Sequence, residues 1–272
     1  MTGDATSKLQ KLLAQAGLGS RRDMEQWISA GRITVNDVTA RLGARVGEHD
    51  VVKVDGRVLQ ATASAARLPQ VLIYHKPEGE IVSRDDPAGR PSVFEKLPRL
   101  RGAKWVAVGR LDFNSCGLLV FTTSGELANR MMHPSHGLER EYAVRVLGKL
   151  TEEQIERLRS GVRLDDGVAR CDSVEPGGGE GANRWYRIVL KEGRNRIVRR
   201  MFETLGLKVS RLMRVRFGPV ALPPRLRRGQ LQELTPAEAR QLLISLGLPA
   251  PAPRAARNPA QTRHRRHSYR AR

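Results

Sequence analysis

The stretch VGRLDFNSCGLLVFTT, residues 108–123, contains a single carboxylate, Asp112, between an arginine and a polar turn, with apolar residues on both sides. This pattern predicts an aspartate in a turn at the rim of a sheet, between two strands. An aspartate in such a turn commonly accepts hydrogen bonds from neighbouring backbone N–H groups. Asp112 is therefore either a turn cap or a group held at a sheet edge for chemistry.

Apolar alternation typical of strands recurs on both sides of this turn, and helical patterns lie between the strands. The expected strands fall in residues 71–74, 105–112, 117–123, 141–148 and 184–193, and the expected helices in residues 124–132, 151–161 and 194–206. The order shows no regular βαβ alternation. We therefore expect an α+β fold with a mainly antiparallel central sheet.

The first sixty residues predict two short helices and a compact sheet. Ser20 with Asp23 three residues later is a capping-box pattern, and glycines 17 and 31 are suitable helix stops. The expected helices cover residues 7–17, with Ser7 as the cap, and 20–31, and the expected strands cover residues 32–37 and 50–59, the second with an Asp55-Gly56 turn.

Composition shifts divide the chain into four parts. Residues 1–60 form a small helix-pair domain, residues 61–70 a weakly patterned linker and residues 71–248 the larger domain. Residues 249–272 contain seven arginines and no acid, so we expect a disordered basic tail that adds affinity for a polyanion.

Charge is the first indication of function. The 272 residues carry 48 Lys+Arg against 28 Asp+Glu, a net charge of +20, which favours polyanionic partners over a merely soluble basic surface. Aromatic residues make up only 4%, so serial base stacking is not expected to dominate binding. No apolar run is long enough to cross a bilayer and no secretory signal precedes the first helix, which predicts a cytoplasmic protein.

The cysteines and histidines do not indicate a metal site or a reactive thiol. Cys116 and Cys171 have no metal-ligand spacing and are expected to be small buried residues. His133 and His136 are close in sequence, but no third ligand cluster accompanies them. We expect neither a metal nor an organic cofactor.

The segment GRNRIVRRMFETLG, residues 193–206, predicts a helix preceded by arginines. Arg199 is the arginine most nearly flanked by the apolar face, so we expect it to be partly buried and to need a carboxylate. Its neighbours Arg194, Arg196 and Arg200 suit RNA phosphates. Tyr142 opens a strand in REYAVRV and is either a core ring or a site residue.

The motifs together resemble a known family. Residues 7–59, with KLLAQAGLGSRRDMEQWISAGRITVN, resemble the S4 RNA-binding module, although a helix pair with incidental surface charge is the alternative. The blocks KPEG, VGRLDFNSCGLLVFTTSGELANRMMHPS, REYAVRV and KEGRNRIVRRMFETLGLKVSRLMRVRFGPV resemble the ribosomal RNA pseudouridine synthases. The likeness is to the branch that comprises the small-subunit enzymes of type A and the large-subunit enzymes of types B, E and F, and it is greatest for type B.

The resemblance implies the pseudouridine synthase fold and site-specific isomerisation of uridine to pseudouridine in ribosomal RNA, with large-subunit RNA the expected partner. The motifs leave the oligomeric state open, and a monomer is our expectation. It implies Asp112 as catalytic aspartate, Tyr142 as active-site tyrosine and Arg199 as the arginine paired with the aspartate. Ser115 and Ile197 stand where threonine and a glutamine or glutamate are frequent in the family. The expected RNA-binding residues are Lys8, Lys11, Arg21, Arg22, Arg32, Arg110, Arg194, Asn195, Arg196 and Arg200.

Two other classes of function remain open at this stage. A non-catalytic ribosome-assembly protein could keep the same fold with Asp112 as a turn cap. A general polyanion-binding protein would need the basic residues alone and would leave the GRLD block and Tyr142 unexplained. The choice of uridine depends on RNA shape and cannot be read from these motifs.

Overall fold

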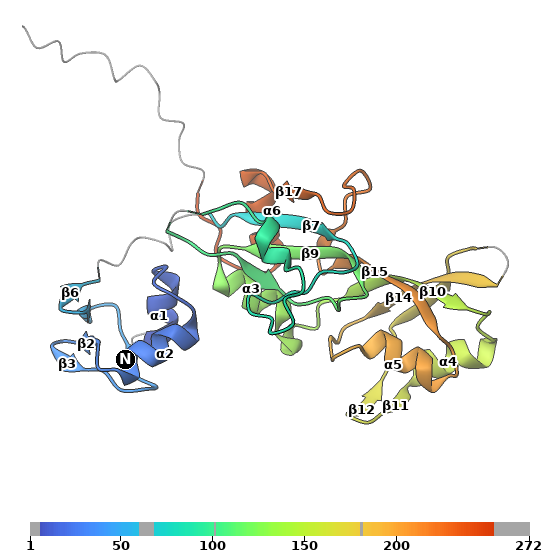
Figure 1. Ribbon diagram of the computed structural model, residues 1–272, viewed down its shortest axis with the longest axis horizontal. Helices are drawn as coiled ribbons and strands as arrows, with labels where there is room; N and C mark the ends of the chain where they lie inside the picture. Colours follow the sequence, from blue (N-terminus) through green and yellow to red (C-terminus); the bar gives the residue numbers. More distant parts are fainter. Residues whose placement is uncertain (1–5, 60–67, 101, 180–181, 253–272) are drawn as a thin grey trace, which may run out of the picture.

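The structure is a computed structural model that describes residues 6–59, 68–100, 102–179 and 182–252 (Figure 1). Most of the expected linker, residues 61–67, and most of the expected tail, residues 253–272, lie outside the described residues. Residues 249–252 are described, and there Pro251 O accepts a hydrogen bond from Arg240 Nε at 3.1 Å while Ala250 packs against the second domain. Residues just after the expected boundary at 248 therefore still contact the larger domain.

The N-terminal domain contains the expected helix pair and a small sheet. Its elements are β1 Ser7–Lys8, α1 Leu9–Gln15, α2 Arg21–Ser29, β2 Ile33–Val35, β3 Val38–Thr39, β4 Arg45–Val46, β5 Val52–Val54 and β6 Arg57–Val58. Strands pair in the order β3-β2-β5-β6, and β1 pairs with β4. Buried Leu9, Leu13, Met24 and Ile28 from the two helices share one core with Ile33 of the sheet.

The two helix starts differ in how their backbone N–H groups are satisfied. The capping box at Ser20 is present as predicted, with Asp23 N donating to Ser20 Oγ and Ser20 N donating to the Asp23 carboxylate. The predicted Ser7 cap is wrong, because Ser7 lies in β1 and α1 begins after Lys8 without a side-chain cap. Leu9 N instead donates to Ala44 O, so a tertiary contact replaces the cap.

The second domain is built on a large sheet, which within the described residues has nine strands. The strands are β7 Val71–Lys76, β8 Val106–Val108, β9 Cys116–Thr122, β10 Arg140–Leu147, β13 Ser173–Pro176, β14 Asn183–Leu190, β15 Val209–Phe217, β16 Val220–Ala221 and β17 Leu231–Glu233. They run in the order β13-β14-β10-β15-β9-β7-β17, with β8 beside β9 and β16 beside β15. Pairing is antiparallel except between β15 and β9, which confirms the predicted α+β class.

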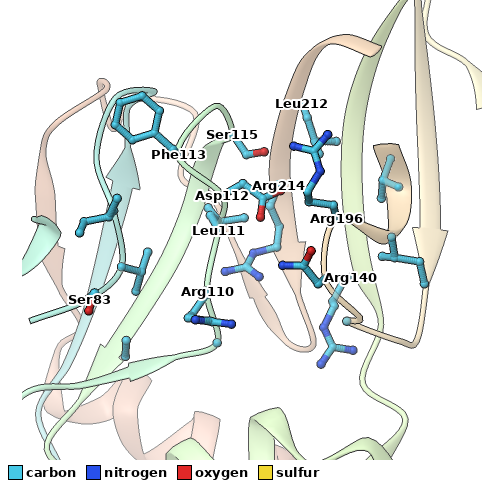
Figure 2. A pocket seen from close by; sticks show the side chains of 18 of the residues that line it. Ser83, Arg110, Leu111, Asp112, Phe113, Ser115, Arg140, Arg196, Leu212 and Arg214 are labelled. Atoms are coloured by element: carbon cyan, nitrogen blue, oxygen red, sulfur yellow. The ribbon is translucent and has the colours of Figure 1, made fainter. Parts of the chain in front are cut away.

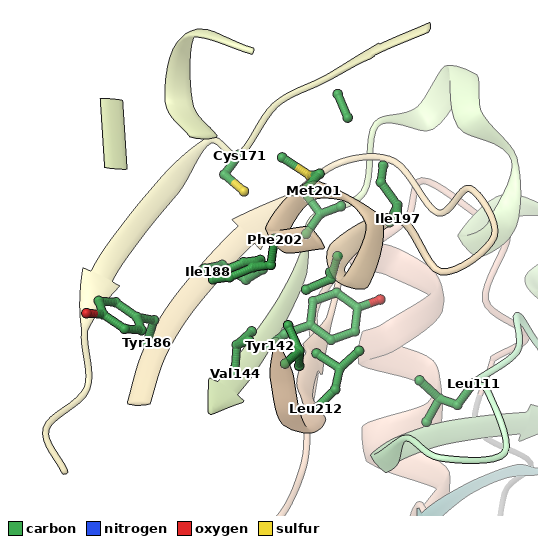
Figure 3. Packing of buried hydrophobic residues seen from close by; sticks show 14 of the residues in the cluster. Leu111, Tyr142, Val144, Cys171, Tyr186, Ile188, Ile197, Met201, Phe202 and Leu212 are labelled. Carbon is green, nitrogen blue, oxygen red and sulfur yellow. The ribbon is translucent and has the colours of Figure 1, made fainter. Parts of the chain in front are cut away.

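Helices cover both faces of this sheet. They are α3 Gly125–Met132, α4 Glu152–Ser160, α5 Ile197–Thr204 and α6 Pro236–Ser245, with 3-10 turns at Val93–Lys96 and Pro134–His136 and a hairpin of β11 Val162–Leu164 and β12 Gly167–Ala169. One apolar cluster joins α4 and α5 to β10, β14 and β15 (Figure 3). A second joins α3 and α6 to the opposite face of β7 and β9. Strands β7 and β9 are consequently buried on both sides and read as continuous apolar runs.

The parallel contact between β9 and β15 requires a glycine. Gly117 has φ +106°, and a Cβ there would lie 2.2 Å from Arg214 O and 2.7 Å from Arg214 N. Only glycine tolerates both this backbone conformation and this close approach. The contact brings the turn that contains Asp112 next to Arg214, which is far away in the sequence.

Candidate active site

The Asp112 turn connects β8 to β9 at the end of the sheet. Ser115 N donates to the backbone oxygen of Asp112 at 3.1 Å, which closes the turn. Within the described residues, the half-buried Asp112 carboxylate accepts no hydrogen bond from the protein and lies in no ion pair within 4.0 Å. A turn cap would accept a hydrogen bond from a nearby backbone N–H group, and the Asp112 carboxylate accepts none among the described residues. The interpretation of Asp112 as a turn cap therefore lacks support.

Lys76 lies beneath this turn and supports it. Its side chain is fully buried, and Nζ donates to Ser115 O at 2.8 Å, Pro77 O at 2.9 Å and Asp112 O at 3.1 Å. Burial lowers the pKa of Lys76 to about 8, although the nearby Glu80 carboxylate opposes the shift. Lys76 was not predicted as a site residue, although it stands at the end of an apolar strand whose residues are all buried.

A cavity of about 850 Å³ opens in front of Asp112, between the β8–β9 turn, the inner face of β10 and β15, and the loop before α5. Figure 2 shows Asp112 at its centre, with Arg196 reaching from the facing loop and Arg110, Arg140 and Arg214 along one side. The cavity brings together six of the predicted site residues: Asp112, Tyr142, Arg110, Arg194, Asn195 and Arg196. Ser115 and Ile197, the two positions that depart from the family wording, also line it.

Tyr142 is both a core residue and a cavity residue. Its side chain is only 7% exposed and its ring packs with Val144, Ile188 and Leu212 in the first apolar cluster (Figure 3). In the same view the hydroxyl points toward the side on which Leu111 lies, where the cavity is. A planar ring fixed at a cavity wall can stack on a base.

Arg199 is buried as predicted, but its partners are different from those expected. Nη2 donates to Asn114 O at 2.7 Å and Nη1 to Val209 O at 3.0 Å, whereas no ion pair with Asp112 is formed within 4.0 Å. Burial lowers the pKa of Arg199, nearby Arg196 adds to this, and Asp112 opposes it. Arg199 therefore fixes the turn through the Asn114 carbonyl and acts on the carboxylate only at longer range.

Two arginines predicted to contact RNA are engaged within the protein. Arg194 donates to Asp166 at 2.8 Å and to Glu192 at 2.7 Å, and Arg200 donates to the second oxygen of Asp166 at 2.8 Å. The two arginines lower the pKa of Asp166, and the hydrogen bond from Arg200 has the larger effect. Because Arg194 also donates to Val168 O at 2.8 Å, it ties the loop before α5 to the β11–β12 hairpin. Arg200 does not line the cavity.

The other residues predicted to contact RNA differ in how far they are exposed. Arg196 and Asn195 are exposed at the cavity rim, and Arg196 adopts a left-handed backbone conformation with φ +49°. In the N-terminal domain Lys8, Arg21 and Arg22 are exposed and Lys11 is half-buried. Arg32 stacks over Trp27, 4.0 Å from the ring centroid, and donates to Asp55 at 2.9 Å, so only part of its guanidinium is free for RNA.

Arg140 and Arg214 were not predicted from the sequence, although both line the cavity and are almost fully buried. Once the strand is known, Arg214 falls two residues after inward-facing Leu212 and shares its face of the strand. Arg140 likewise precedes inward-facing Tyr142 by two residues.

Other potential chemistry is limited in the part of the chain that the structure describes. No group of three or more His, Cys, Asp and Glu side chains is arranged to hold a metal ion there. Both cysteines are free and buried, and burial raises the pKa of Cys171 to about 12. No helix among the described residues has the length and apolarity to span a membrane.

Comparisons with known proteins agree with this geometry. Residues 70–204 match the RNA pseudouridylate synthase family, and residues 7–52 match the S4 domain. A "Ribosomal large subunit pseudouridine synthase B" of Pseudomonas aeruginosa is 55% identical over 89% of this chain and 63% of its own length. Proteins with the same description from Shigella flexneri and Escherichia coli K12 are each 52% identical over 90% of this chain, covering 85% and 84% of their lengths.

A solved structure gives the same result for the fold. The crystal structure of a pseudouridylate synthase superposes with a TM-score of 0.60 at 25% identity, covering 86% of this chain and 99% of that one. The level of identity to the curated relatives, the two matched domains and this fold together show that the chain belongs to the RNA pseudouridylate synthase family and carries an S4 domain at its N-terminal end.

Proposed function

We propose that this pseudouridine synthase converts one uridine of large-subunit ribosomal RNA to pseudouridine, as a cytoplasmic monomer and with Asp112 as the catalytic group. Membership of the family supports the reaction, and the names of the curated relatives support the large-subunit substrate. The observation that carries the assignment of Asp112 is its carboxylate, which has no hydrogen-bond partner among the described residues and lines a cavity large enough for a nucleotide.

The reaction requires a group that stabilises a broken glycosidic bond while the base is retained. The bond from C1′ to N1 breaks, the base turns, a bond from C1′ to C5 forms, and the C5 proton leaves as N1 takes one up. An aspartate is ionised at neutral pH and can act as the nucleophile or remove a sugar proton. Lys76 and Arg199 hold the turn of Asp112 through its backbone carbonyls, so we assign them positioning roles.

Tyr142 is proposed to stack on the uracil and to help remove the proton from C5. The support for this role is a ring that is 7% exposed, fixed by apolar neighbours, with its edge at the cavity. A target base must leave its helix to reach such a buried ring, which costs a few kcal/mol of unstacking. Exposed Arg110, Asn195 and Arg196 at the rim, with the basic residues of the N-terminal domain, are suited to offset that cost through phosphate contacts.

The test is tritium release from large-subunit ribosomal RNA transcripts labelled at C5 of uridine. We expect about one equivalent of tritium from the wild-type protein and none from Asp112→Asn, with RNA binding retained by both. Asp85→Asn is the matched control, because Asp85 is an exposed carboxylate at the wall of the same cavity and undergoes the same change of charge. The control should release tritium as the wild type does.

The alternative is a non-catalytic assembly protein that uses the same surfaces to bind RNA. It predicts no release from large-subunit RNA, small-subunit RNA or assembled precursors, with tight binding in every case. Equal release by the wild type and Asp112→Asn would retain the reaction and reject Asp112 as its catalytic group.

A further inference from the structure

Arg140 and Arg214 form a buried pair of like charges at the inner wall of the cavity. Their side chains are 8% and 2% exposed, and both guanidiniums lie on the ring of Phe217, 4.7 Å and 5.0 Å from its centroid. Within the described residues neither has a carboxylate within 4.0 Å. Burial lowers the pKa of each arginine, and the nearby Tyr142 hydroxyl opposes this lowering in both.

Backbone carbonyls hold both arginines but leave part of each guanidinium unused. Arg140 Nη1 donates to Leu138 O at 3.0 Å and to Lys191 O at 2.5 Å, and Arg214 Nε donates to Leu118 O at 2.9 Å. Arg214 Nη2 is buried without any hydrogen-bond partner among the described residues. A buried cationic N–H group without an acceptor raises the free energy of the folded protein. A ligand oxygen that accepts its hydrogen bond would remove this cost.

Two glycines of the cavity wall lie against these guanidiniums. A Cβ on Gly193 would lie 3.2 Å from Arg140 Nε and 3.5 Å from Nη2, and a Cβ on Gly109 would lie 3.9 Å from Arg214 Nη1. Figure 2 shows Arg140 and Arg214 on the same side of the cavity, below Asp112. Both arginines line the cavity, so a ligand in the cavity lies beside them.

We propose that Arg140 and Arg214 together form a subsite for one phosphodiester of the target strand, the phosphate that flanks the flipped uridine. This inference rests on the proposed function. A phosphodiester carries one negative charge and two free oxygens, which suits two guanidiniums fixed on one ring. A neutral uracil carbonyl could accept one bond, but it carries no net charge to offset either buried positive charge.

The proposed subsite also implies that base flipping precedes phosphate binding by the two arginines. The phosphate can offset positive charge of the arginine pair only when the nucleotide has left its helix, because both side chains are almost fully buried in the cavity wall. Binding at the subsite thereby favours the flipped state and brings the uracil to Tyr142 and Asp112. Arg140 and Arg214 are thus binding residues for the nucleotide, not groups that react with it.

The test neutralises the phosphate and the arginine in turn. The substrate is an RNA stem-loop around the uridine identified by sequencing the product, with the phosphate on either side of that uridine replaced singly by methylphosphonate. We expect one replacement to weaken binding to the wild type by about ten- to hundredfold, the range for a hydrogen-bonded charge pair. Arg214→Met should bind unmodified RNA more weakly than the wild type does, by a similar factor. Replacing the phosphate by methylphosphonate should then weaken RNA binding by Arg214→Met by less than about threefold more.

The matched control is Arg216→Met, on the same strand. Arg216 donates to Glu141 and Glu139 and does not line the cavity, so this variant should keep the wild-type sensitivity to methylphosphonate. If Arg214→Met fails to fold, as judged by thermal unfolding, Arg214→Lys and Gly193→Ala provide the same comparison. Gly193→Ala covers Arg140 and should reduce the methylphosphonate effect.

The outcomes separate this proposal from the proposed function. Turnover by the wild type, with the same methylphosphonate sensitivity in the Arg214 and Arg216 variants, overturns the subsite alone. A wild type that binds both methylphosphonates as tightly as unmodified RNA overturns it as well. Absence of pseudouridine from every ribosomal RNA substrate overturns the proposed function, and the subsite with it.

Discussion

Replacing Lys76 by methionine should separate catalysis from stability. Lys76 Nζ is the donor for Ser115 O and Pro77 O and a second donor for Asp112 O, so the ammonium group fixes both ends of the turn that contains Asp112. Methionine fills a similar volume without any donor. The turn then loses its support from below, and the Asp112 carboxylate is free to shift.

Two opposing energies set the effect on stability. Two buried carbonyls lose their donor, at about 1–3 kcal/mol each. Removing the ammonium relieves its burial, and a pKa lowered from 10.5 to about 8 corresponds to about 3 kcal/mol. These energies largely cancel, so the free energy of unfolding of Lys76→Met near pH 7 should lie within about 3 kcal/mol of the wild-type value.

Catalysis should be far more sensitive than stability. A displacement of a catalytic group by about 1 Å can reduce a rate by about a hundredfold. We therefore expect the single-turnover rate of tritium release to fall by about a hundredfold, with RNA affinity within threefold of wild type, since Lys76 does not line the cavity. Lys208→Met, which removes an exposed lysine, is the control and should keep the wild-type rate.

The pH dependence gives a second readout of the same substitution. Because the folded pKa of Lys76 is lowered, the unfolded chain binds more protons between about pH 8 and 10.5, and the wild type gains stability relative to Lys76→Met as pH rises through that window. Denaturant unfolding at pH 7 and pH 10 measures this difference. A wild-type rate in Lys76→Met, or a stability difference that is the same at both pH values, would refute the reasoning.

Three further substitutions test other parts of the structure. Gly117→Ala places a Cβ 2.2 Å from the backbone of β15 and should leave little folded protein, whereas Gly125→Ala, in helix α3 with open space around it, should be as stable as wild type or slightly more so by thermal unfolding. Arg196→Met should reduce the slope of log affinity against log salt concentration, measured by filter binding, by about 0.7–0.9. Arg194→Met should leave that slope unchanged, because the Arg194 guanidinium is already bound to protein acceptors. Ser20→Ala removes the capping box and should destabilise the N-terminal domain by about 1 kcal/mol, measured by hydrogen exchange of α2, and unchanged exchange would contradict the assigned cap.

Local patterns were sufficient for the elements that depend on neighbours in sequence. The capping box at Ser20 and the buried strand from Val71 were predicted, since capping groups lie three residues apart and side chains alternate along a strand. The strand over residues 209–217 was missed because arginines at 211, 214 and 216 interrupt its apolar alternation. Helix α6 was missed although Thr235 and Glu238 form a capping box there.

The sequence by itself determined the helix pair of the N-terminal domain, the α+β class of the second domain, the basic charge, the family and the turn that contains Asp112. Only the tertiary structure decided what each arginine does, because a guanidinium binds whichever acceptor the packing brings to it. Arg194 and Arg200 meet Asp166, and Arg199 meets the Asn114 carbonyl. Arg214 reaches Leu118 O across 96 positions of the chain because β9 and β15 pack side by side, and no local pattern encodes a contact of that range.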